Sequence, residues 1–390
     1  MLTSARWFTY ETAARYRKVF ERVYAEMVRE TGSRAIDGIL YWMRAERVLF
    51  GPGNRPVDAI QAEFQDRWAD IFPIPPDQRQ VNYRAEELRE RVLRDFDAPR
   101  PGWNRARYHS PDIMIAASSL QAIERGEYDL VMGELHMGGN TLGISFFLEQ
   151  HPDREELFCA VERDIPESRI IAVAPKYGIS STARTHIRLL SGRDFRLEFA
   201  LSSCAPRKAT PLPIGALVVE QGEHGLVVRT RDGQRQFDII EAFADILTGL
   251  STNSFKMFKP RKHQPRVTID RLVVSRESWS LSPSEIGFAF EKNDACRHEA
   301  ARQWAYSNGM PRFVYIKSPV EIKPLYVDFD SPIYVDILAK IVRRTAENGA
   351  PDALIAVSEM LPDLDHIWLP DAEGNRYTSE FRIVAVDTFS

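Results

Sequence analysis

The chain of 390 residues is 44% hydrophobic and 27% charged, a composition that excludes general disorder and allows two or three globular domains. Its 51 basic and 55 acidic residues give a formal net charge of −4, so the chain is not uniformly polycationic and any nucleic-acid binding has to be local. No apolar run reaches about 18 residues, no signal-peptide pattern is present, and the three cysteines form no CxxC pair. We therefore expect a cytoplasmic protein without a membrane span and without a metal site.

Helical periodicity dominates residues 1–104, which we predict to form a helical region. Apolar side chains recur there at three- and four-residue spacing, beginning at Trp7 and continuing to Met27. Proline and glycine break the pattern in two short segments, because neither residue suits a helix interior. After the first helix, the pattern predicts helices over 36–50, 57–71 and 85–96.

Short apolar strands alternate with helices in the rest of the chain. Between residues 169 and 281, β-branched runs separated by Gly-rich turns favour a mostly antiparallel sheet. The expected fold class is α+β or mixed α/β, with an N-terminal helical region followed by a mixed, largely antiparallel β-sheet with flanking helices. The predicted segments are an α/β segment at 105–165, a β-rich basic segment at 166–290 and a C-terminal α/β segment at 291–390.

Basic charge is concentrated in two stretches. Residues 166–213 hold eight basic and three acidic residues, and residues 246–269 hold five basic and no acidic ones, so each stretch carries +5 and the remainder carries −4 − 10 = −14. Such segregation suits a polyanion-binding face on which Phe255 and Phe258 could stack on unpaired bases. The alternative is that these cations form only the solvated side of a sheet. The candidate binding residues are Arg184, Arg188, Lys256, Lys259, Arg261, Lys262 and Arg266.

The sequence GELHMGGNT, residues 133–141, is the main candidate for chemistry. It follows a predicted buried strand, and its glycines permit close approach of the backbone. Glu134 and His136 would share one face of the strand, where they could act as an acid–base pair. Alternatively, they form a structural pair that hydrogen-bonds neighbouring backbone. Glu134, His136 and Asn140 are the candidate catalytic residues, without an assigned role.

Two other groups of polar residues have structural interpretations. His109, Ser110 and Asp112 are too close in sequence to converge as a catalytic triad, and the Ser-Pro-Asp sequence is interpreted as a turn and helix N-cap. Asp328 and Asp330 precede a predicted helix and are interpreted as part of its cap.

Six segments, spread over nearly the whole chain, carry a family resemblance. They are SARWFTYETAARYR (4–17), ARYHSPDIMIAA (106–117), YDLVMGELHMGGNTL (128–142), HQPRVTIDRLVVSRESW (263–279), PRFVYIKSPVEIKPLYVDFDSP (311–332) and SEMLPDLDHIWLPDAEGNRYTSEFRIVAV (358–386). In this order they resemble the lantibiotic dehydratase family, in its actinobacterial variants, and the related peptide aminoacyl-tRNA ligases. The resemblance is to the second half of the family's glutamylation domain.

The resemblance implies work on a ribosomally made precursor peptide, with an aminoacyl-tRNA as co-substrate and no other cofactor. In the dehydratases, glutamate passes from glutamyl-tRNA to a Ser or Thr hydroxyl of the peptide. In the ligases, an amino acid is added to the peptide's C-terminus. The basic candidate residues would then bind tRNA, and a second chain would supply the first half of the domain. No catalytic residue is carried over from the family.

Three hypotheses about function follow. The first is half of a split, aminoacyl-tRNA-dependent acyltransferase or dehydratase, whose tRNA binding depends on Lys259, Arg261 and Lys262. The second is a non-catalytic scaffold or peptide-binding subunit, which would be recovered in a complex and would not bind tRNA. The third is an unrelated hydrolase that uses His136 and Glu134 and needs no tRNA.

Overall fold

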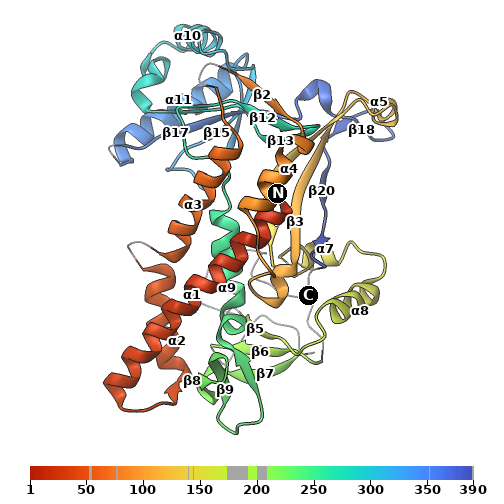
Figure 1. The fold of residues 1–390 in the computed structure, drawn as a ribbon. Coiled ribbons are helices and arrows are strands. Elements are labelled where there is room, and N and C mark those ends of the chain that lie inside the picture. The colour runs from red at the N-terminus through yellow and green to blue at the C-terminus, as the bar shows by residue number, and fades with distance from the viewer. Residues whose placement is uncertain are drawn as a thin grey trace.

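The computed structural model describes residues 1–51, 55–75, 78–138, 140–143, 145–173, 192–199, 209–350 and 352–388. In Figure 1 the N-terminal helices form an elongated column, and the C-terminal part with α10 and α11 lies at its upper end. No helix in the described ranges is long and apolar enough to cross a membrane. The candidate residues Arg184 and Arg188 lie outside the described residues.

The helices follow the predicted pattern closely. For the three helices after the first, the predicted and observed bounds differ by at most two residues, because Pro, Gly or capping residues limit these helices. The helices are α1 (Leu2–Thr31), α2 (Gly38–Phe50), α3 (Pro56–Ile71), α4 (Ala85–Asp95), α5 (Leu120–Glu124), α6 (Asn140–Gly143), α7 (Ser145–Leu148), α8 (Arg154–Asp164), α9 (Ile239–Ser254), α10 (Asp294–Ser307) and α11 (Pro332–Asn348).

Most of the strands are short, except β3 and β4, and the strands belong to several sheets. They are β1 (Ile36–Asp37), β2 (Gln80–Tyr83), β3 (Tyr108–Ala116), β4 (Asp129–Met137), β5 (Ile170–Val173), β6 (Phe195–Glu198), β7 (Thr210–Pro213), β8 (Leu217–Gly222), β9 (Gly225–Thr230), β10 (Gln236–Asp238), β11 (His263–Gln264), β12 (Arg266–Ile269), β13 (Leu272–Ser275), β14 (Ser278–Leu281), β15 (Phe313–Lys317), β16 (Leu325–Asp328), β17 (Ile355–Glu359), β18 (Leu369–Pro370), β19 (Arg376–Tyr377), β20 (Glu380–Arg382) and β21 (Ala385–Val386).

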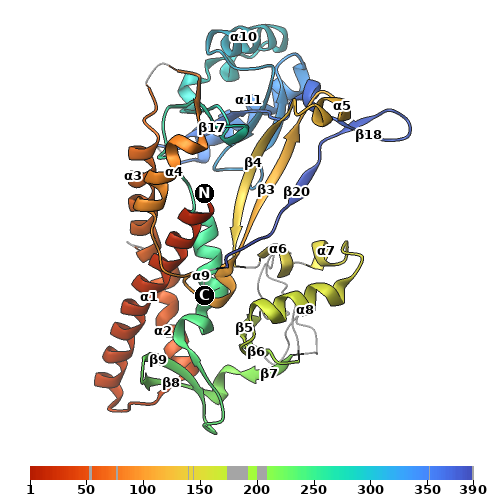
Figure 2. The ribbon, with the colours of Figure 1, turned by 45° about the vertical axis from the view of Figure 1, so that its right-hand side comes forward.

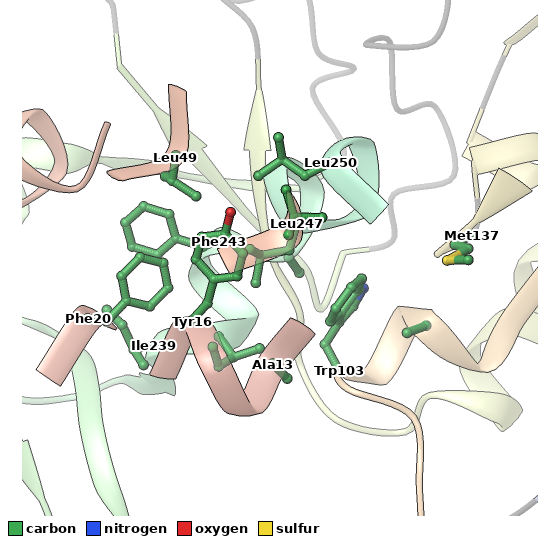
Figure 3. Close-up of a cluster of buried hydrophobic side chains, with 14 of the residues drawn as sticks. Ala13, Tyr16, Phe20, Leu49, Trp103, Met137, Ile239, Phe243, Leu247 and Leu250 are labelled. Carbon is green, nitrogen blue, oxygen red and sulfur yellow. The ribbon is translucent and has the colours of Figure 1, made fainter. Parts of the chain in front are cut away.

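The main hydrophobic core forms where α9 packs against α1, α2 and α3. Figure 3 shows part of it, where side chains of α9 lie beside side chains of α1 and α2. Phe243 of α9 is its centre: its ring stacks on Trp42 with centroids 3.9 Å apart and lies 4.5 Å from the ring of Phe20. Burying such aromatic rings supplies a large part of the stability of a helical assembly. The helix α9 also reaches β4, so the core directly supports the hairpin described below.

A seven-stranded sheet joins distant parts of the chain. Its main path is β2-β12-β13-β4-β3-β20, and β21 pairs with β3. The sheet therefore takes strands from all four segments that the sequence pattern delimits. Figure 2 shows its long β3–β4 hairpin running between the C-terminal part and the region of α6.

A five-stranded sheet of order β11-β14-β17-β15-β16 organises the C-terminal part of the chain. Alternate side chains, among them Val314, Ile316 and Val357, point to one face and form a second core with α10 and α11. All strand pairs in this sheet are antiparallel.

The β-rich segment does not form one continuous sheet. Strands β8, β9 and β10 are antiparallel neighbours, whereas β5, β6 and β7 form a separate parallel sheet. Strands β12 and β13 pair with each other but belong to the seven-stranded sheet. The predicted single antiparallel sheet over 169–281 is therefore wrong in its continuity, because strand propensity does not specify which strands pair. The predicted α+β fold class is confirmed.

A buried ionic junction connects the seven-stranded and five-stranded sheets. Glu277, between β13 and β14, accepts two hydrogen bonds of 2.8 Å from Arg79 and lies 2.8 Å from Nε2 of His263. Glu359, at the end of β17, pairs with Arg266 through both carboxylate oxygens and accepts a 2.8 Å hydrogen bond from the Glu277 backbone N–H. The two glutamates are only 5% and 4% exposed, so their charges depend on these partners.

Candidate active site

A β-bulge shapes the polar face of the β3–β4 hairpin. The register of the pair shifts between Pro111 and Ile113, where Gly133 and Glu134 of β4 lie opposite Asp112 alone. Such bulges re-aim side chains and occur next to functional sites. The segment interpreted as a turn and N-cap is therefore strand, and this prediction is wrong because β3 pairs on both sides through most of its length.

A buried His–Asp pair lies at the centre of this face. We call this pair, together with its polar neighbours, the β3–β4 site. Nε2 of His136 lies 3.0 Å from Oδ2 of Asp112. Arg382 of β20, the register partner of Asp112, forms an ion pair with its other carboxylate oxygen. The Asp112 carboxylate, which pairs with this cation, can therefore accept a hydrogen bond from an Nε2–H group of His136.

Two further contacts surround the pair. Glu134 lies 3.8 Å from Nε2 of His136, and its other oxygen lies 3.6 Å from Nζ of Lys256. Ser110, opposite His136 in the strand register, accepts a 2.5 Å hydrogen bond from the hydroxyl of Thr141 in α6. The β3–β4 site is therefore covered by α6 on one side and bounded by the half-exposed Lys256 on another.

The structure brings two of the three candidate catalytic residues together. Glu134 and His136 share one face of β4, as the spacing predicts, but the closer partner of His136 is Asp112. Asn140 begins α6, and its side chain lies outside the described residues. Sequence reasoning missed Asp112 and Arg382, because only strand pairing places them beside His136.

The glycines of this motif have a structural role. Gly138 has φ of +69°, and a Cβ there would lie 2.3 Å from the Thr248 hydroxyl of α9. Thr248 also accepts a 3.2 Å hydrogen bond from the indole N–H of Trp103. Gly138 therefore allows the end of β4 to pass close to the central helix.

Replacing Gly138 by alanine should lower the free energy of unfolding by about 2 kcal/mol, since it adds left-handed backbone strain and a clash with Thr248. Chemical denaturation would measure the loss. Gly249→Ala is the matched control, because apart from its own helix no described residue has an atom within 4 Å of a Cβ there, and alanine favours a helix. A Gly138→Ala variant as stable as wild type would contradict this explanation of the motif.

His109 lies on the other side of the hairpin from His136. It is 2% exposed, and neither ring nitrogen has a hydrogen-bond partner among the described residues. Burial lowers the pKa of His109 to about 4, against a smaller opposing effect of Asp387. His109 is therefore a neutral core residue at neutral pH.

The described cations of the basic stretch 246–269 are mostly paired with acids. Lys259 pairs with Asp66, Lys262 lies 2.5 Å from Glu285, and Lys256 pairs with Glu134 as described above. Arg261 is exposed, whereas Arg266 is part of the ionic junction. Exposed ion pairs of this kind are worth about 0 to 1 kcal/mol, so a polyanion can replace the acids at little cost.

The aromatic residues of this stretch serve the core. Phe255 is buried, with its ring 4.6 Å from that of Phe64, and Phe258 packs against Phe72. The expectation that Phe255 stacks on unpaired bases is therefore wrong, because its ring faces the interior.

Asp328 and Asp330 form ion pairs with arginine side chains. Nε of Arg312 is 2.8 Å from Asp328 and 3.1 Å from Asp330, and the N-cap of α11, Ser331, makes no side-chain capping bond. The capping interpretation is wrong because the carboxylates turn toward Arg312. Within the described ranges, no group of three or more His, Cys, Asp or Glu side chains could hold a metal ion.

Comparison with known proteins shows which solved structures this fold resembles. The chain resembles the glutamylation domain of TbtB from thiomuracin biosynthesis, with a TM-score of 0.53 and 14% identity over 98% of this chain and 49% of that chain. The same domain bound to 5'-phosphodesmethylglutamycin gives a TM-score of 0.53 and 15% identity over the same shares. The tRNA-dependent lantibiotic dehydratase MibB from Microbispora sp. 107891 gives a TM-score of 0.47 and 15% identity, over 78% of this chain and 32% of that chain. No curated protein sequence matches the chain.

The fold is thus similar to part of the TbtB glutamylation domain, because this chain spans about half the length of the TbtB structures. Residues 252–338 match the family model described as lantibiotic dehydratase, N terminus. The predicted resemblance to the lantibiotic dehydratase family is confirmed by this match and by the similar fold. The matched range includes the whole basic segment from Lys256 to Arg266.

Proposed function

We propose that the protein takes part in the biosynthesis of a ribosomally made, modified peptide, through acyl transfer from an aminoacyl-tRNA. The observation that carries the proposal is the glutamylation-domain fold, which extends over 98% of the chain. The acyl group passes either to a Ser or Thr hydroxyl of the precursor peptide or to its C-terminus. This chain spans about half of its structural relatives, and in this proposal a second chain supplies the part that it does not cover.

The basic segment is the proposed contact with the tRNA backbone. Lys259, Arg261 and Lys262 are exposed, and the acids that pair with two of them can be displaced. Phosphate groups would replace Asp66 and Glu285 as partners, with release of counterions from the RNA. Neutralising these two acids should therefore strengthen binding, whereas removing the lysines should weaken it.

A triple variant with Lys259, Arg261 and Lys262 changed to alanine should bind tRNA more weakly, with a salt dependence reduced by about 2 to 3 in the log–log slope, because each phosphate contact contributes about 0.7 to 0.9. Filter binding between low and moderate salt would measure the slope. The variant Asp66→Asn with Glu285→Gln should shift affinity in the opposite direction.

Lys340→Ala is the matched control, since this exposed lysine of α11 is also ion-paired, with Asp336, but lies outside the basic segment. An unchanged slope in the triple variant would refute the assignment of this surface. If the wild-type protein binds no tRNA and transfers no acyl group with its partner chain, the scaffold hypothesis replaces this one.

A further inference from the structure

One ring nitrogen of His136 has no hydrogen-bond partner in the part of the chain that the structure describes. The residue is 3% exposed, and among the described residues no group hydrogen-bonds Nδ1. A buried polar atom without a partner costs about 1 to 3 kcal/mol. The other nitrogen, in contrast, is held by Asp112 at 3.0 Å.

The charge of the neighbours decides which nitrogen carries the proton. Arg382 neutralises Asp112 in an ion pair, so the aspartate stays an acceptor and Nε2–H is its donor. In the neutral ring, Nδ1 then holds the lone pair. His109 differs, because among the described residues neither of its ring nitrogens has a hydrogen-bond partner. Carboxylate orientation of an imidazole, with the free nitrogen directed away, is the arrangement of a general base.

We propose that Nδ1 of His136 is the proton acceptor for a hydroxyl-bearing acyl acceptor, with Asp112 and Arg382 as positioning residues. The inference rests on the proposed acyl-transfer function. Nδ1 takes the hydroxyl proton while the oxygen forms a bond to the ester carbonyl carbon of the aminoacyl-tRNA. The ester C–O bond then breaks, and the ribose oxygen that leaves receives the proton from Nδ1, so the imidazole is regenerated.

Nearby groups fit this role. Lys256, paired with Glu134 at the edge of the β3–β4 site, supplies a positive charge that can attract an anionic substrate group such as a phosphate. Thr141 of α6 covers the site through its hydrogen bond to Ser110.

The purely structural interpretation makes a different prediction. A His–Asp pair that only links β3 to β4 would tolerate glutamine at position 136, because the amide N–H can still donate to Asp112. The proposed base cannot be replaced in this way, because a glutamine amide does not accept a proton at neutral pH.

The test uses the full chain together with its partner chain, aminoacyl-tRNA and precursor peptide. His136→Gln should lower kcat by a factor of about 10² to 10⁴, and Asp112→Asn should lower it in the same range, with the KM for tRNA unchanged. Arg382→Lys, which keeps a cation beside Asp112, should retain most of kcat. The control His109→Leu removes an equally buried histidine outside the site and should keep wild-type kcat.

A second readout does not depend on turnover. In the wild-type chain labelled with ¹⁵N-histidine, the nitrogen spectrum of His136 should show a protonated Nε2 and an unprotonated Nδ1. A proton on Nδ1 of the neutral ring would overturn the inference even if the variants do not fold. A wild-type kcat in His136→Gln would overturn this inference and leave the proposed function standing. If the wild-type complex transfers no acyl group, both the inference and the proposed function are overturned.

Discussion

Replacing Glu359 by alanine should lower the free energy of unfolding by about 3 to 5 kcal/mol, the range for removing one partner of a buried ion pair. The substitution leaves the guanidinium of Arg266 and the backbone N–H of Glu277 without their acceptor, at a position that is 4% exposed. Because these contacts join the two large sheets, the loss should also weaken their association. Urea unfolding followed by fluorescence would measure the change.

The matched control for this prediction is Glu30→Ala. Glu30 also pairs with an arginine, Arg44, through both oxygens, but on the surface, and its removal should leave stability nearly unchanged. The double variant Glu359→Ala with Arg266→Ala should recover part of the loss, because it removes the uncompensated charge. Equal stabilities of Glu359→Ala and Glu30→Ala would show that the junction contributes nothing.

Acid should destabilise the protein through His109. Its pKa is lowered from 6.5 to about 4 in the folded chain, mainly by burial, so the unfolded chain binds a proton first as the pH falls. The stability that depends on the neutral state of His109 is therefore fully present above pH 6.5 and is lost progressively toward pH 4. At 1.36 kcal/mol for each pKa unit, the loss amounts to about 3 kcal/mol.

The measurement is the difference in unfolding free energy between wild type and His109→Leu as a function of pH. Leucine is apolar, is similar in size to histidine and does not titrate. The variant should therefore gain stability relative to wild type below pH 6.5. Asp387, Arg6 and the terminal ammonium also act on His109, and both proteins retain them. His224→Gln, at an exposed histidine, should follow the wild-type curve. A pH-independent difference between wild type and His109→Leu would refute the prediction.

The helices could be predicted because the signals that define them are local. Apolar spacing, together with Gly and Pro near the ends, delimits α1, α2 and α3 within a few residues. In the same region, β2 went unpredicted, since its four residues form a strand only by pairing with β12. Non-local pairing carries no local signal, and this also explains why a single antiparallel sheet was expected where the structure has several.

The candidate site could also be predicted only in part, because some of its residues meet only through strand pairing. The pair of Glu134 and His136 follows from the two-residue period of a strand. Asp112 had been interpreted as part of a turn, because Ser-Pro-Asp resembles one locally, yet strand pairing on both sides of β3 keeps it extended. Arg382 lies 270 positions further along the chain, and only the pairing of β20 with β3 brings it to Asp112.

The composition and charge pattern by themselves determined a globular α+β chain with local basic stretches, and the order of its segments determined the family resemblance. The tertiary structure decided which polar residues meet. It placed Asp112 and Arg382 around His136, joined Arg266 to Glu359, and directed Phe255 into the core. These outcomes depend on sheet register and packing between distant segments, which the free energy of the whole fold selects and no local pattern encodes.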